Sequence, residues 1–199
     1  ASPVLQAVLN GDSMTGVSIM KIDEGMDTGD VLSMEETSIP PEATTGYMEM
    51  VLASQGADLL VRTLREYAAG RISPVPQDHD RATYAPKISK EDAVVDWNKD
   101  AEAVRNQIRA LNPRPGAFTT IGDDPVILKI WKARQIEDDI NPEMLPGTIY
   151  STAGEGFKAA CGKGTSLEIL EVQLSGKGRI RARDFVNGFD VQAGDRMGV

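Results

Sequence analysis

Residues 11–20 read GDSMTGVSIM and residues 26–30 read MDTGD, and these two stretches decide the fold of the first part of the chain. Val17 and Ile19 alternate with small or polar residues, which is the period-2 spacing of a strand. The MDTGD stretch combines Asp and Gly as a turn does, and a second extended run follows over 31–39. The sequence therefore predicts two strands joined by this turn.

Helices are predicted on both sides of the two strands. Ser2 is placed to cap a short helix with Pro3 in its first position. Thr44 or Thr45 can cap a long helix that ends at Gly70. The apolar face of this helix is predicted to consist of Met48, Val51, Leu52, Leu59, Leu60, Leu64 and Tyr67. This α/β segment has too few strands for a covered sheet, so we expect further structure to precede it.

The rest of the chain divides into a linker and a β-rich part. Residues 71–92 contain three prolines and no apolar periodicity, which is typical of an extended linker. A short helix capped by Asp100 comes next. Five strand-like runs between Gly-rich turns then indicate a small barrel, at 117–121, 126–136, 147–151, 157–161 and 167–174. The predicted domains are 1–70 and 93–199, with the linker over 71–92.

Composition excludes several classes of protein. The chain has 199 residues, 41% of them hydrophobic and 26% charged, which is typical of a folded protein and not of a disordered one. No apolar run approaches the roughly 18 residues of a membrane span, and no signal peptide begins the chain, so we expect a soluble, cytoplasmic protein without a membrane contact. Cys161 and His79 are the only residues of their types, which argues against a disulfide framework and a metal site.

Charge is distributed unevenly along the chain. The formal net charge is −9, but residues 1–92 hold 7 Lys or Arg against 15 Asp or Glu, whereas residues 93–199 hold 14 against 15. The acidity therefore belongs to the first part. A contact with nucleic acid remains possible in the second.

The quoted stretches, together with later motifs, resemble the methionyl-tRNA formyltransferase family. The later motifs are Pro76-Gln77-Asp78, Tyr84-Ala85-Pro86-Lys87-Ile88, Asp96-Trp97, Arg109-Ala110-Leu111-Asn112-Pro113 and Pro115-Gly116-Ala117. The resemblance implies an α/β plus β fold, in which the tail of a Rossmann-like formyltransferase domain precedes a small OB-like β-barrel domain. It also implies a monomeric, metal-free enzyme that transfers a formyl group from 10-formyltetrahydrofolate to the amino group of methionyl initiator tRNA in translation initiation.

The family uses an Asn, a His and an Asp for this reaction, and the resemblance matches the Asp to Asp27. The family's Asn and His motifs lie upstream of Ala1, so we expect this chain alone to be inactive. A carboxylate beside an imidazole can hold the tautomer of the ring and stabilise its cation while an amine attacks. The alternative is that Asp27 only shapes a turn, as Asp beside Gly often does. No residue is assigned to folate binding.

A second candidate site is the run Lys177-Gly178-Arg179-Ile180-Arg181-Ala182-Arg183, in which cations alternate with other residues. An extended backbone would place Lys177, Arg179 and Arg181 on one face, where they could bind tRNA phosphates. A helix that begins near Ala182 would turn Arg183 away. The alternative is an edge strand that its charges protect from aggregation.

Three points remain open at this stage. Where the family commonly has Trp, this chain has Arg114, which either contacts a phosphate or is merely exposed. Trp97 and Trp131 are predicted to pack in the barrel, the alternative being that they stack on bases. The other functions that the sequence allows are formyl transfer to a nucleotide sugar and a non-catalytic RNA-binding module.

Overall fold

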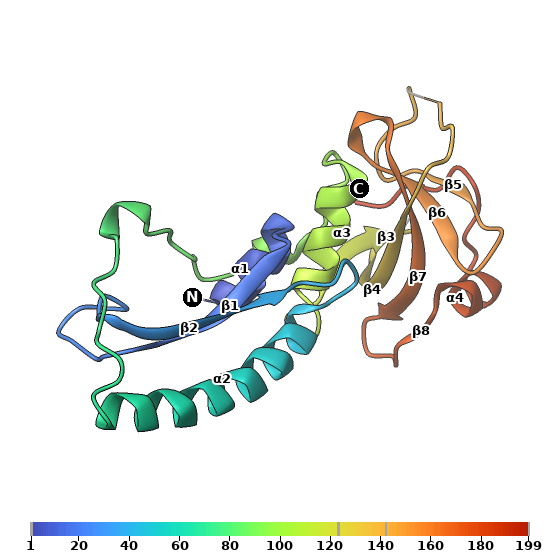
Figure 1. Ribbon diagram of the computed structural model, residues 1–199. Helices are drawn as coiled ribbons and strands as arrows, with labels where there is room; N and C mark the ends of the chain where they lie inside the picture. Colours follow the sequence, from blue (N-terminus) through green and yellow to red (C-terminus); the bar gives the residue numbers. More distant parts are fainter. Residues whose placement is uncertain (1, 123, 142, 199) are drawn as a thin grey trace.

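The computed structural model describes residues 2–122, 124–141 and 143–198. Figure 1 shows an elongated molecule, with a hairpin and a long helix at one end and a curled β-sheet at the other. Helices α1 and α3 lie between the two ends. No helix in the described ranges combines the length and the hydropathy that crossing a bilayer requires.

The first part of the chain consists of α1 (Pro3–Asn10), β1 (Met14–Met20) and β2 (Val31–Ser38). Gly11 ends α1 in the left-handed conformation with φ 77°, while the Ser2 side chain makes no capping hydrogen bond. The two strands pair antiparallel, with Met14 opposite Ser38. The two predicted strands and their connecting turn are therefore confirmed.

Helix α2 (Thr45–Ala68) runs alongside this hairpin (Figure 1), and the Thr44 hydroxyl accepts a hydrogen bond from the Tyr47 amide at its start. The residues of α2 that are buried are Thr45, Met48, Leu52, Leu59 and Thr63. The predicted face was wrong for Leu60, Leu64 and Tyr67, which are 42%, 53% and 39% exposed. Polar bonds from the hairpin, Ser33 to Thr63 and Thr37 to Gln55, fix a different rotation of the helix.

The segment after α2 returns along the hairpin and contains two short 3₁₀ turns, η1 (His79–Arg81) and η2 (Glu91–Ala93). Its main regular contact is a backbone pair with β2, in which Val31 and Val75 exchange hydrogen bonds of 2.8 Å. Helix α3 (Ala101–Ala110) begins at Asp100, whose carboxylate accepts from the Ala103 amide at 2.9 Å. This predicted cap is confirmed.

The second part of the chain is an antiparallel sheet with the strand order β3-β4-β7-β6-β5. Its strands are β3 (Ala117–Ile121), β4 (Val126–Ile136), β5 (Ile149–Ser151), β6 (Phe157–Ala160) and β7 (Ser166–Leu174). A short β8 (Ile180–Arg181) pairs with β7, η3 (Gly162–Gly164) joins β6 to β7, and α4 (Ala182–Gly188) follows β8. The five predicted strands are confirmed, as an open curled sheet: β3 and β5 do not pair with each other in the described part of the chain.

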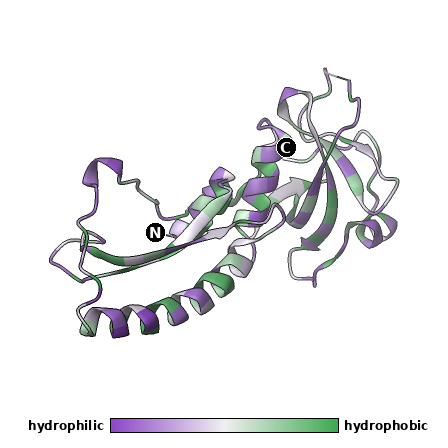
Figure 2. Ribbon diagram, viewed as in Figure 1, coloured by the Kyte–Doolittle hydropathy of each residue, from purple (hydrophilic) through white to green (hydrophobic). Residues whose placement is uncertain are grey.

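The largest core lies inside this sheet and continues to α1 through α3. Its fully buried side chains include Ile108, Leu128, Ile130, Ile149, Phe157, Leu167, Ile169 and Phe185. Figure 2 shows both hydrophobic and hydrophilic residues along the strands of this sheet. The first four residues of β7 are all buried, Ser166 and Glu168 included. Leu5 and Val8 of α1 belong to the same buried cluster, so the two parts of the chain pack on each other.

Candidate functional site

Asp27 lies in the loop that joins β1 to β2, and its side chain is exposed. Its backbone adopts φ 57°, a left-handed conformation that few residues other than Gly take up. In residues 2–122, 124–141 and 143–198 there is no hydrogen bond or ion pair to its carboxylate. The carboxylate is therefore available to a group from outside the described structure.

The Asp27 loop, which we define as residues 21–30, is braced from within. Asp23 Oδ1 accepts hydrogen bonds from the Gly25 amide at 3.1 Å and from Thr28 Oγ1 at 2.7 Å. The Lys21 amide donates to the Asp30 carbonyl at 2.9 Å. Gly29 passes so close to Lys21 that a Cβ would lie 1.7 Å from the Lys21 carbonyl oxygen, so only Gly fits there.

The linker adds a contact that the sequence analysis missed. Gln77 Nε2 donates to the carbonyl oxygen of Asp27 at 2.9 Å and to that of Gly29 at 2.7 Å. It also lies 3.8 Å from the Met20 sulfur. Gln77 belongs to the Pro76-Gln77-Asp78 motif, which was the available signal, but its target could not be read from the sequence.

A second site, the basic groove, is formed by Lys132, Arg179, Arg181 and Arg183. These side chains line a cavity of about 550 Å³ beside β8, together with the carboxylates of Glu155, Glu171 and Asp184. Strand register explains the arrangement, because Lys132 and Arg181 both lie opposite Glu171 on β7. The groove therefore brings together cations from β4, β8, α4 and the loop before β8.

The predicted placement of Lys177, Arg179 and Arg181 on one face is confirmed for two of these three residues. Arg179 and Arg181 lie together in the basic groove, but Lys177 lies outside its lining. The backbone turns at Gly176, with φ 74°, and only 180–181 are strand, so Lys177 does not continue an extended row. Helix α4 does begin at Ala182 as predicted, yet Arg183 still faces the groove from its first turn.

Lys132 was missed by the sequence analysis. It is exposed between buried Trp131 and Ala133 on β4, although period-2 alternation would place it on the same face as buried Leu128 and Ile130. Irregular register against β7 on both sides of Lys132 interrupts the alternation, so the sequence pattern did not predict its outward position.

Both tryptophans are buried, with Trp97 4% and Trp131 6% exposed. Trp97 packs in the main hydrophobic cluster as predicted, whereas Trp131 is not among the residues of that cluster and has Arg179 over its ring. The Trp97 indole Nε1 donates to Thr119 Oγ1 at 3.0 Å.

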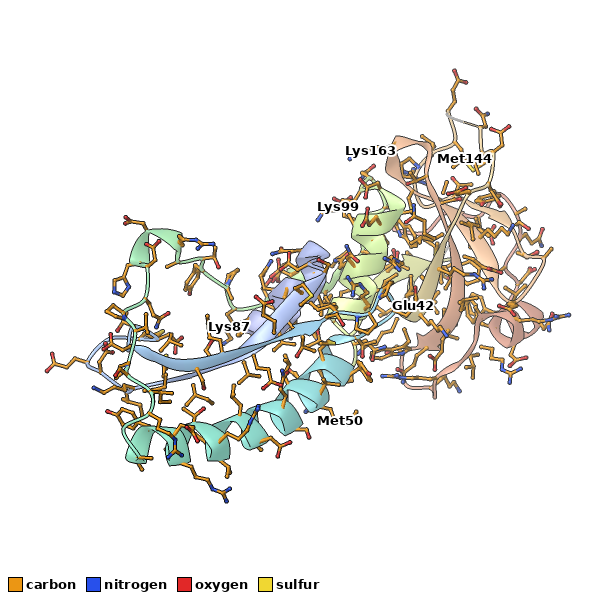
Figure 3. The ribbon with its side chains drawn as sticks, in the orientation of Figure 1. Glu42, Met50, Lys87, Lys99, Met144 and Lys163 are labelled. Carbon is orange, nitrogen blue, oxygen red and sulfur yellow. The ribbon has the colours of Figure 1, made fainter. Side chains whose placement is uncertain are left out.

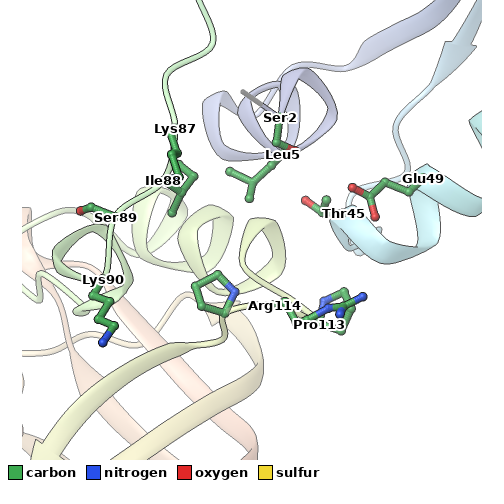
Figure 4. Close-up of a pocket in the computed structure, with 11 residues that line it drawn as sticks. Ser2, Leu5, Thr45, Glu49, Lys87, Ile88, Ser89, Lys90, Pro113 and Arg114 are labelled. Carbon is green, nitrogen blue, oxygen red and sulfur yellow. The ribbon is translucent and has the colours of Figure 1, made fainter.

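Arg114 lies at a third hollow, where the linker meets α1 and the start of α2. This cavity of about 630 Å³ has an apolar lining that includes Leu5, Ile88 and Pro113 (Figure 4). Lys87, which lies on the linker in Figure 3, and Lys90 also line it. Arg114 is exposed, so the structure leaves both of its predicted roles open.

Comparison with known proteins places the chain among formyl transferases. The family described as formyl transferase, C-terminal domain, matches residues 87–190, and the family described as formyl transferase matches residues 1–64. The chain belongs to the formyl transferase family. The described residues of this formyl transferase contain no group of three or more His, Cys, Asp or Glu that could hold a metal ion.

Curated relatives agree with the resemblance that the motifs indicated. The formyl transferase chain is 44% identical over 198 residues to the methionyl-tRNA formyltransferase of Symbiobacterium thermophilum and 40% identical to that of Bacillus subtilis. These alignments cover 99% and 100% of this chain but 60% and 61% of the relatives. The chain therefore spans about 60% of the length of the curated relatives that it matches.

Solved structures share the fold. Methionyl-tRNA formyltransferase from Clostridium thermocellum is 25% identical, with a TM-score of 0.51 over 67% of this chain and 56% of that one. HypX from Aquifex aeolicus, in complex with tetrahydrofolic acid, has a TM-score of 0.69 at 18% identity, over 95% of this chain and 33% of that one. The N-formyltransferase from Helicobacter canadensis, in complex with folinic acid and dTDP-3-aminofucose, has a TM-score of 0.62 at 18% identity, over 85% and 60%.

Proposed function

We propose that this chain is the larger part of a methionyl-tRNA formyltransferase. The enzyme would transfer a formyl group from 10-formyltetrahydrofolate to the α-amino group of methionine on initiator tRNA. The observation that carries the proposal is the identity of 38–44% that extends along almost the whole chain to relatives of that name. We assign the Asp27 loop to the transfer step and the basic groove to the binding of tRNA.

Asp27 is proposed as a catalytic residue. An attacking amine must lose a proton, and the carbonyl oxygen that it attacks gains negative charge. The exposed carboxylate of Asp27 can accept a hydrogen bond from an imidazole, fix the tautomer of the ring and stabilise its cationic form. The resemblance supplies such a His from the family's upstream motif. The hydrogen bonds within the Asp27 loop stabilise the backbone from which this carboxylate projects.

The basic groove, with Lys177 beside it, is proposed to bind the tRNA backbone. Lys177, Arg179 and Arg181 were the residues predicted from the sequence, and Lys132 and Arg183 join them in space. Phosphate contacts position a nucleic acid without reading its sequence. Such contacts would orient the tRNA while its aminoacylated end reacts at another part of the enzyme. The carboxylates of the groove reduce its net charge and restrict where a phosphate can bind.

The remaining properties are proposed with this function. The formyl donor is a co-substrate, and Asp27 is the only described residue that we assign to the transfer step. We propose the domains 1–70 and 93–199 with the linker over 71–92, an OB-like closure of the β-sheet, a monomeric enzyme, and a location in the cytoplasm, where translation begins. Sedimentation of the complete enzyme tests the monomer.

Formyl transfer to a nucleotide sugar is a second candidate, because a structure with such a ligand shares the fold. Its identity is 18%, against 44% for a methionyl-tRNA formyltransferase. A non-catalytic RNA-binding module is a third candidate, supported by the basic groove alone.

A substrate comparison with the complete enzyme separates the three. We expect formylation of methionyl initiator tRNA with 10-formyltetrahydrofolate and none of a dTDP-amino sugar. Formylation of the sugar alone would support the second candidate, and tRNA binding without any transfer would support the third. The 199-residue chain assayed alone is expected to bind tRNA without formylating it.

A further inference from the structure

One side chain from the linker holds the backbone on both sides of Thr28. The two N–H bonds of the Gln77 amide are shared between the Asp27 and Gly29 carbonyl oxygens, at 2.9 Å and 2.7 Å. Glutamine has two such donors on one nitrogen, so a single residue can satisfy both acceptors. These bonds reach across 50 and 48 residues of sequence and are therefore not part of a local turn.

The Asp27 carbonyl is the atom through which this contact can control a side chain. Its direction is set by the ψ angle of Asp27, which also relates the Cα–Cβ bond to the peptide that follows. With φ at 57°, the residue occupies a small and sparsely populated region. A bond that holds the carbonyl therefore restrains the direction of the Cα–Cβ bond, from which the carboxylate projects.

The linker is itself fixed beside this loop. Val75, two residues before Gln77, exchanges two backbone hydrogen bonds of 2.8 Å with Val31, which follows directly on Asp30. The Gln77 side chain is half-buried and also contacts the Met20 sulfur at the end of β1. The pairing of Val75 with the first residue of β2 therefore fixes the position from which the Gln77 amide reaches the Asp27 loop.

We propose that Gln77 is a positioning residue for formyl transfer, which acts by holding the backbone of Asp27 so that its Cα–Cβ bond points the carboxylate towards the reacting groups. This inference rests on the proposed function, and in particular on the catalytic role of Asp27. It gives the linker a task in the reaction besides the connection of two domains.

The test uses the complete enzyme and five variants, one of which is Asp27→Asn alone. Gln77→Met keeps the length of the side chain and loses both donors, and Gln77→Glu keeps the shape but presents acceptors to the two carbonyl oxygens. Gln135→Met is the matched control, because Gln135 is an exposed glutamine on β4. Asp27→Asn is combined with Gln77→Met in a double variant.

We expect both Gln77 variants to lower kcat by roughly 10- to 100-fold, because a small displacement of a catalytic group has effects of this order. KM for tRNA and the melting temperature should stay at the values of Gln135→Met. If Gln77 acts through Asp27, Gln77→Met should change the rate of the Asp27→Asn enzyme less than about twofold, because residues that act as a unit are not additive.

The outcomes separate the inference from the function on which it rests. If Asp27→Asn loses activity while both Gln77 variants keep the kcat of the control, the inference is wrong and the proposed function stands. Equal losses from Gln77→Met in the presence and absence of the Asp27 carboxylate would also overturn it. Full activity of Asp27→Asn would instead contradict the catalytic role of Asp27, and the inference would fail with it.

Discussion

Arg179 lies over the indole ring of Trp131, with its guanidinium carbon 3.5 Å from the ring centroid. Trp131 is buried on β4, and its Nε1 donates to Gln173 Oε1 at 3.0 Å. Gln173 Nε2 in turn donates to the Lys177 carbonyl at 2.6 Å. A planar guanidinium stacks well on an indole face. The buried ring therefore sets the direction of a cation in the basic groove.

Arg179→Lys is expected to keep the charge and lose the stacking, since an ammonium is compact and more strongly hydrated. The affinity for tRNA should fall several-fold, while the slope of log affinity against log salt stays unchanged. Arg179→Ala should lower both the affinity and the salt slope, because fewer counterions are released on binding when one phosphate contact is lost. Titrations of tRNA at several salt concentrations measure both quantities. A smaller salt slope for Arg179→Lys would contradict this assignment.

Replacement of Lys177, Arg179 and Arg181 by Ala together should weaken tRNA binding and flatten its salt dependence. We expect about 1 kcal/mol per lost phosphate contact, and less for Lys177, which lies outside the groove lining. The effect should appear in KM for tRNA and leave KM for the folate unchanged. Lys99→Ala, an exposed cation on another surface, is the control. Identical binding by triple variant and control would mean that tRNA is held elsewhere.

Asp27→Asn keeps the size of the side chain and removes the charge that would stabilise a cationic imidazole. The rate of formyl transfer by the complete enzyme should fall by roughly two orders of magnitude or more. Folding should change little, because the carboxylate is exposed. Steady-state rates and circular dichroism give the two measurements. A folded variant with normal activity would leave Asp27 with a turn-forming role.

The thiol of Cys161 can report on folding and on the pH dependence of stability. Burial raises the pKa of its thiol to about 12, and the nearby Asp100 adds to the effect. Since only the thiolate reacts, iodoacetamide should leave the folded 199-residue chain unlabelled at pH 8 and should label it in guanidinium. The folded state holds this proton more tightly, so the stability that it contributes should be lost as the pH rises from about 9 towards 12. Rapid labelling of the folded chain at pH 8 would contradict the burial.

Local signals were enough for most elements of the fold. Thr44 and Asp100 cap their helices, and the strand-like run 126–136 forms β4, as the sequence predicted. Each of these features depends on residues a few positions apart, so hydrogen bonding and periodicity encode them without reference to the rest of the chain. Sequence motifs likewise suffice to indicate the formyl transferase family.

Tertiary structure alone decided which distant residues meet. The rotation of α2 depends on polar bonds from β2, so Leu60 could not be placed by periodicity. Lys132 joins Arg181 because both strands take their register from β7, and Gln77 reaches Asp27 because the linker pairs with β2 at Val75. Such contacts depend on the path of the whole backbone, which no window of neighbouring residues contains.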